Sequence, residues 1–199
     1  MTARLLTRGL LAAAAMLAPA VAMAHTGSHA GGLMHGFAHP VSGFDHILAM
    51  LMVGAFAWQL GGRALWLVPA SFVTLMAVGG ALGAAGLAVP FVEIGIALSV
   101  VVLGAVVALG VRAPLAAAMA VVGLFALFHG HAHGAEMPAE TGAFGYAAGF
   151  MIATALLHVA GISIGALTGS VHTGRAAITV RTAGGIASAA GIGLLFGLV

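Results

Sequence analysis

The sequence predicts an all-α polytopic membrane protein, a compact bundle of six transmembrane helices after a cleavable signal peptide. Two features of composition indicate this class: hydrophobic residues make up 62% of the 199 residues, and charged residues only 5%. A third is that apolar stretches near twenty residues long recur, about the length that a helix needs to cross a bilayer. We expect helices because a helix satisfies its backbone polar groups within one segment.

Residues 1–24 are expected to be a secretory signal peptide. Arg4 and Arg8 precede an apolar stretch at 9–17, and Ala22-Met23-Ala24 matches an A-x-A cleavage site. Cleavage there makes His25 the first residue of the mature chain. The alternative is an uncleaved signal anchor, for which the apolar stretch is short.

Residues 40–199 are expected to form the transmembrane domain, after a periplasmic, histidine-containing segment at 25–39. Pro40 suits the first helical position, with His39 just outside in the extended conformation that precedes proline. Glycines four residues apart, such as Gly79 and Gly83, predict close helix packing and therefore a compact bundle. The spans are expected at Pro40 to Leu60, Ala64 to Ala88, Pro90 to Val111, Pro114 to Phe128, Gly142 to Leu167 and Ile178 to Val199.

The positions of the arginines predict the orientation of the spans. Export of the new amino terminus makes the first span run inward, and short loops then alternate sides. Arg63, Arg112 and Arg175 fall in loops assigned to the cytoplasm, and Arg181 lies at the cytoplasmic start of the last span, as the positive-inside rule requires. The four acidic residues and eight of the ten histidines fall on or near the opposite side. The outer side is therefore expected to carry the metal ligands.

Composition also excludes several functions. The chain has no cysteine, so disulfides, thiolate metal sites and cysteine nucleophiles are absent. It has no lysine and no basic cluster, so we expect no nucleic-acid partner. Gly161 to Gly165 matches the short G-x-S-x-G pattern, but inside an expected membrane helix rather than at a strand-to-helix turn. We therefore expect no catalytic residues and no enzyme.

The first motif is His39-Pro40-Val41-Ser42-Gly43-Phe44-Asp45-His46. Asp45 is expected about 7.5 Å inward of the helix start, and ionisable groups inside a membrane usually mark ion or substrate paths. The alternative is that Asp45 compensates the positive helix end while a neighbouring helix satisfies His46. Glu93, near the start of the third span, either completes a site with Asp45 and His46 or stabilises its own helix end.

The second motif contains His129, His131, His133 and Glu136, near the outer end of the fourth span. In a helix His129 and His133 share a face and His131 turns away, whereas in an extended segment all three point the same way. Three imidazoles and a carboxylate suit nickel, cobalt, copper or zinc better than magnesium or calcium. The alternative is a solvated histidine loop without a metal.

Other histidines have weaker assignments. His25, His29 and His35 lie near the expected mature amino terminus, where they either collect metal or form a flexible tail; the free amine and imidazole of His25 would make a bidentate chelate. His158, deep in the fifth span, is either an inner relay ligand or a core histidine bonded to Ser163 or to a backbone carbonyl.

These motifs, the leader and the six spans resemble the HupE/UreJ family of nickel permeases. The resemblance implies an inner-membrane secondary permease that brings Ni2+, sometimes Co2+, into the cytoplasm for hydrogenase or urease maturation proteins, with no tightly bound cofactor. It implies a metal path through His39, Asp45, His46, His129 and His133, with His131 between the last two. Two alternatives stay open: a membrane-bound metal-binding accessory protein or chaperone without transport, and a zinc-dependent membrane hydrolase.

Overall fold

The computed structural model describes residues 28–137, 142–168 and 174–198. The expected signal peptide, His25, Glu140 and His172 lie outside these residues. Within the described ranges the chain forms helices and no strand, which confirms the predicted all-α class. The helices are α2 (Ser28–Ala38), α3 (Phe44–Leu60), α4 (Ala64–Ala84), α5 (Val92–Leu109), α6 (Leu115–Ala135), α7 (Ala143–Thr168) and α8 (Gly174–Leu195).

Five of these helices, α4 to α8, are long and apolar enough to cross a membrane. The apolar helix α3 has 17 residues, at the short end of the range for a span. It is also the most deeply placed helix, since an unbroken run from Met52 to Trp58 is buried. The chain is therefore a polytopic membrane bundle, with α3 at its centre.

The predicted start of the first span is wrong, because α3 begins at Phe44 and Pro40 lies in the preceding turn. The backbone N–H and the hydroxyl of Ser42 both donate to the carbonyl oxygen of His39, at 3.1 and 2.7 Å. Gly43 then has an extended conformation and caps the helix. The serine bonds hold the backbone in a turn at the point where proline would otherwise start a helix.

The predicted end of the fourth span is also wrong, because α6 continues past Phe128 to Ala135 and includes all three histidines of the second motif. Gly130 and Gly134 do not end the helix. A Cβ on Gly130 would lie 2.0 Å from the carbonyl oxygen of Met76, and one on Gly134 would lie 2.1 Å from that of Gly80. These glycines therefore allow the backbones of α4 and α6 to touch.

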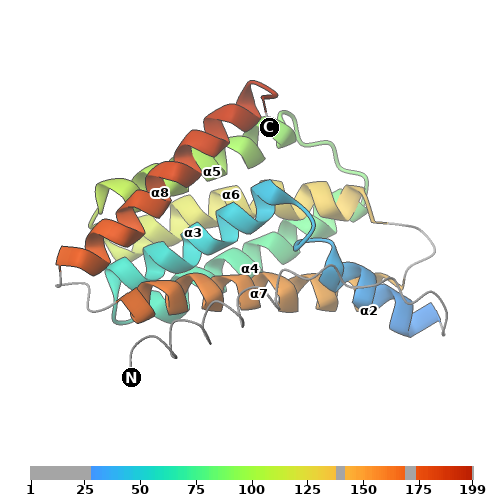
Figure 1. Ribbon diagram of the computed structural model, residues 1–199. Coiled ribbons are helices and arrows are strands. Elements are labelled where there is room, and N and C mark those ends of the chain that lie inside the picture. Colours follow the sequence, from blue (N-terminus) through green and yellow to red (C-terminus); the bar gives the residue numbers. More distant parts are fainter. Residues whose placement is uncertain (1–27, 138–141, 169–173, 199) are drawn as a thin grey trace.

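The helices pack mainly in pairs: α4 with α6, α5 with α8, and α7 with both α2 and α3 (Figure 1). Helix α8 lies on α5 along one side of the bundle, and α2 lies at the end of the bundle where α3 begins. The segment at 28–38, predicted as part of a histidine-containing tail, is thus a helix packed on α7 through Gly36 and Gly149.

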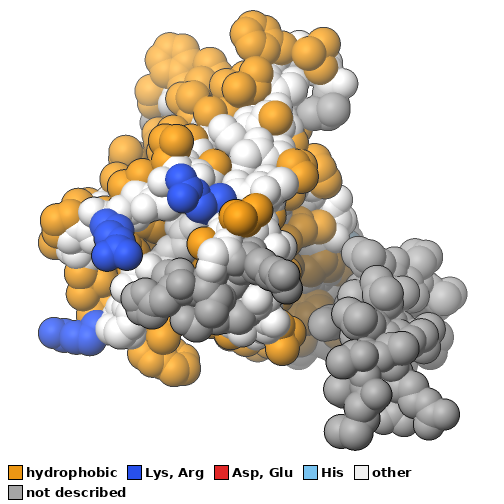
Figure 2. Space-filling view, turned by 60° about the vertical axis from the view of Figure 1, so that its left-hand side comes forward, with side chains coloured by type: hydrophobic (Ala, Val, Ile, Leu, Met, Phe, Trp, Pro, Cys, Tyr) orange, Lys and Arg blue, Asp and Glu red, His pale blue; other side chains and the backbone are white. Residues whose placement is uncertain are grey.

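The arginines lie at the end of the bundle opposite the two histidine motifs. Arg63 precedes α4 and Arg112 follows α5, at the end of the bundle opposite the start of α3. Figure 2 shows blue arginine side chains among orange hydrophobic ones on this end. Arg181 donates to the carbonyl oxygens of Ala108 and Leu109 at 2.7 and 3.1 Å, which caps the carboxyl end of α5.

Candidate metal centre

Three histidines from two helices meet inside the bundle, near the end where α3 begins. His46 lies in the first turn of α3, and His129 and His133 lie one turn apart on α6. His46 Nδ1 is 3.1 Å from His129 Nδ1 and 3.2 Å from His133 Nε2. His46 and His129 are buried and His133 is partly buried. We call His46, His129 and His133 the inner group.

Ser99, in the middle of α5, determines which nitrogen of His129 carries the proton. The Ser99 hydroxyl donates its single proton to the carbonyl oxygen of Ile96 at 2.6 Å. Its oxygen lies 2.8 Å from His129 Nε2, so it accepts the proton of that nitrogen. A neutral His129 then has a lone pair on Nδ1, which faces His46. Metal-binding histidines generally donate their other ring N–H to such a partner.

His133 also belongs to a second, more exposed group with His39 and Glu136, which we call the outer group. His39 Nε2 lies 3.9 Å from Glu136 Oε2, and the His39 and His133 rings meet edge to face at 4.7 Å between centroids. The side chain of Glu136 is 59% exposed. Because the two groups share His133, they form a continuous line of ligands from the surface to the buried inner group.

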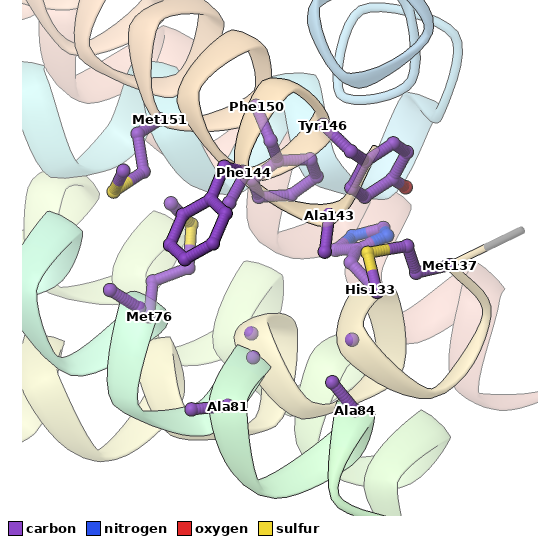
Figure 3. A pocket seen from close by; sticks show the side chains of 15 residues that line it. Met76, Ala81, Ala84, His133, Met137, Ala143, Phe144, Tyr146, Phe150 and Met151 are labelled. Carbon is purple, nitrogen blue, oxygen red and sulfur yellow. The ribbon is translucent and has the colours of Figure 1, made fainter. Parts of the chain in front are cut away.

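Aromatic and other apolar side chains surround these ligands. The Phe150 ring lies 5.2 Å from the His46 ring and 4.5 Å from the His133 ring. A cavity of about 240 Å³ between α4, α6 and α7 reaches His133 (Figure 3). Its other walls are mostly apolar, with Phe144, Phe150 and the methionines Met76, Met137 and Met151 among them.

Some nitrogens of the inner group have no hydrogen-bond partner among the described residues. They are His46 Nε2 and His133 Nδ1, both buried from solvent. Buried polar atoms in folded proteins nearly always have a partner. Three imidazoles that meet at 3.1 and 3.2 Å, two of them with a second ring nitrogen still unpartnered, offer the nitrogen donors that suit a divalent ion of the nickel, cobalt, copper or zinc type.

The acidic candidates Asp45 and Glu93 belong to neither group. Asp45 Oδ1 accepts a hydrogen bond from the backbone N–H of His46 at 2.7 Å, in the first turn of α3. A carboxylate in this position compensates the positive amino end of its helix. Glu93 is exposed in the first turn of α5. Both carboxylates therefore lie where they compensate the positive ends of their helices.

His131 also lies outside both groups. Because α6 stays helical through the motif, His129 and His133 share one face and His131 turns away from them. His131 Nε2 donates to the carbonyl oxygen of Leu87 at 2.6 Å and so contacts the segment between α4 and α5. Ser99 is the polar residue that the sequence analysis missed, although a single hydroxyl within the apolar run at 94–103 was its signal.

Comparisons with known proteins identify relatives over nearly the whole chain. Residues 13–194 match the HupE/UreJ family, described as HupE / UreJ protein. Protein HupE of Rhizobium leguminosarum bv. viciae is 50% identical over 185 residues, which are 92% of this chain and 95% of that protein. No solved structure matches the chain.

Proposed function

The chain belongs to the HupE/UreJ family, and we propose that it is a permease that moves Ni2+ or Co2+ across the inner membrane into the cytoplasm. The ion would serve the maturation of a hydrogenase or urease. The observation that carries this proposal is the inner group, three histidines that meet inside a bundle of apolar helices, two of them buried and one partly buried. Ionisable side chains are costly in such a place and usually mark the path of an ion.

The outer group is the entrance of this path. Glu136 is exposed and attracts a hydrated cation, and His39 and His133 replace part of its water. Because His133 belongs to both groups, it can pass the ion directly to His46 and His129. The orientation follows from the arginines, because the arginine-bearing end faces the cytoplasm under the positive-inside rule. The histidine end then faces the periplasm.

The inner group also meets the requirement that a permease release its cargo. Its ligands are neutral imidazoles, and the whole chain contains no cysteine, so no thiolate holds the ion. Transport requires binding that is favourable enough for entry and weak enough for exit. Imidazole nitrogens select nickel, cobalt, copper and zinc over magnesium and calcium, which prefer oxygen ligands.

The test is uptake of radioactive Ni2+ into proteoliposomes that contain the purified protein. We compare the native chain with His46→Gln and His133→Gln, and with His35→Gln as the control. His35 is an exposed histidine of α2 and belongs to neither ligand group. We expect accumulation by the native and control proteins and a loss of about tenfold or more in the two inner-group variants.

The same experiment separates the permease from its main rival, a metal-binding accessory protein. An accessory protein would bind Ni2+ at the surface of the vesicles, and an ionophore that collapses ion gradients would not release that metal. Accumulated, ionophore-releasable Ni2+ supports the permease. Binding without accumulation by the native chain would reject it.

A further inference from the structure

His158 is a buried histidine that neither ligand group uses. It lies on α7 and is 1% exposed. Neither of its ring nitrogens has a hydrogen-bond partner among the described residues. The sequence left open a core histidine bonded to Ser163 or to a backbone carbonyl, and no such bond forms to either ring nitrogen. A buried imidazole with both nitrogens unpartnered requires another explanation.

His158 lies directly below the inner group, further from the entrance. Phe150, Thr154 and His158 are buried at four-residue spacing on one face of α7. Phe150 contacts His46 and His133, so His158 is two turns, or about 12 Å, further along the helix. Helix α3 indicates the same depth for His158. Gly54 packs against the backbone of His158, and Gly54 lies two helical turns after His46.

One aromatic ring contacts both His158 and the inner group. The Phe72 ring lies 5.8 Å from the His129 ring and 5.1 Å from the His158 ring, measured between centroids. Phe72 is fully buried in α4. An ion that leaves His129 for His158 therefore moves between two imidazoles that contact the same Phe72 ring.

Further donor atoms lie beside this route. Thr154 is fully buried, and its hydroxyl donates to the sulfur of Met76 at 3.7 Å. The hydroxyl oxygen and the thioether sulfur both have lone pairs, and an imidazole with a thioether suits late first-row metals rather than magnesium or calcium.

We propose that His158 is a second metal-binding position on the transport path, which receives the divalent ion from the inner group. This proposal rests on the proposed permease function. It assigns the inner group and His158 different tasks. The inner group receives the ion from the outer group, and His158 binds it next, further into the bundle. Loss of His158 should therefore impair transport more than it impairs binding.

The first experiment compares Ni2+ uptake with Ni2+ binding for His158→Gln. Glutamine keeps a polar side chain of similar length but removes the imidazole. We expect uptake to fall by about tenfold or more, while equilibrium dialysis of the purified protein gives a dissociation constant for the inner group within about threefold of native. His46→Gln should weaken both. Native uptake by His158→Gln would overturn the proposal, and so would equal losses of binding and uptake.

The second experiment asks whether a metal ion reaches this position, independently of uptake. Because the native chain has no cysteine, His158→Cys introduces its only thiol. Ala187→Cys, at a buried position of α8, is the matched control. With Cd2+ added to the purified proteins, we expect an ultraviolet cadmium–thiolate absorption band for His158→Cys and none for Ala187→Cys. No band for His158→Cys, or equal bands for both, would overturn the proposal.

The two experiments distinguish failure of this inference from failure of the permease function. If the native protein accumulates Ni2+ and His158→Gln does so equally, only the role of His158 is rejected. If the native protein accumulates nothing, the permease function is rejected. A misfolded His158→Gln protein is recognised by its elution in size-exclusion chromatography, and the cadmium result then decides.

Discussion

The contact between Ser99 and His129 leads to a quantitative prediction for Ser99→Ala. In the native protein the serine oxygen accepts the proton of His129 Nε2 and so leaves Nδ1 free to bind metal. Alanine removes that acceptor from a fully buried site. His129 must then either keep an unsatisfied buried N–H, at a cost of about 1–3 kcal/mol, or move its proton to Nδ1, where the proton blocks the metal.

The expected loss of affinity follows from either choice. Removal of the partner that orients a metal-binding histidine typically weakens metal binding by about 10- to 100-fold, which corresponds to about 1.4–2.8 kcal/mol. This range agrees with the cost of an unsatisfied buried donor. We therefore expect Ser99→Ala to raise the dissociation constant for Ni2+ by at least about tenfold.

Equilibrium dialysis of the purified protein with radioactive Ni2+ measures this constant directly. Ser71→Ala is the matched control, because the Ser71 hydroxyl also donates to a carbonyl three residues earlier, that of Val68, at 2.8 Å. Among the histidines that the structure describes, none has a ring bonded to Ser71. If Ser99→Ala bound Ni2+ as tightly as Ser71→Ala, the hydrogen bond between Ser99 and His129 would have no role in metal binding.

Two further predictions concern the entrance and the packing. Glu136→Gln should raise the KM for Ni2+ uptake by only about three- to fivefold, because water screens this exposed carboxylate; an unchanged KM would remove Glu136 from the entrance. Gly79→Ala should destabilise the bundle by about 1–3 kcal/mol, because its Cβ would lie 2.3 Å from the carbonyl oxygen of Leu127. Gly80→Ala is the control, since a Cβ on Gly80 would lie 3.5 Å from its nearest neighbouring atom. Equal melting temperatures of the two variants in detergent would show that the close approach at Gly79 does not contribute to stability.

The class of the fold was predictable because the bilayer imposes a simple rule on the sequence. A helix in hydrocarbon needs a long apolar run, and such runs can be counted. The ends of the helices were less predictable. At the start of α3 the two hydrogen bonds of Ser42 outweigh the preference of Pro40 for a first helical turn. At the end of α6 the glycines pack against α4 instead of ending the helix.

The composition of the candidate site was predictable to a similar extent. His39, His46, His129 and His133 were identified from the sequence because polar groups stand out in an apolar chain. The sequence allowed two geometries for the second motif, and only the helical one separates His131 from the other two. Asp45 and Glu93 were predicted as metal ligands for the same reason as the histidines. In the structure they lie at helix ends, outside both ligand groups.

By itself, then, the sequence determined the membrane class, the separation of arginines from histidines and the chemical type of the ligands, because each depends on local composition. The tertiary structure decided which nitrogens face one another: His46 and His129 are 83 residues apart in the chain, yet their Nδ1 atoms lie 3.1 Å apart. It also decided the partner of Ser99 and, within the described residues, left both ring nitrogens of His158 without a hydrogen-bond partner. Such contacts depend on how two helices are rotated against each other, and this rotation is set by the packing of small residues along their whole length.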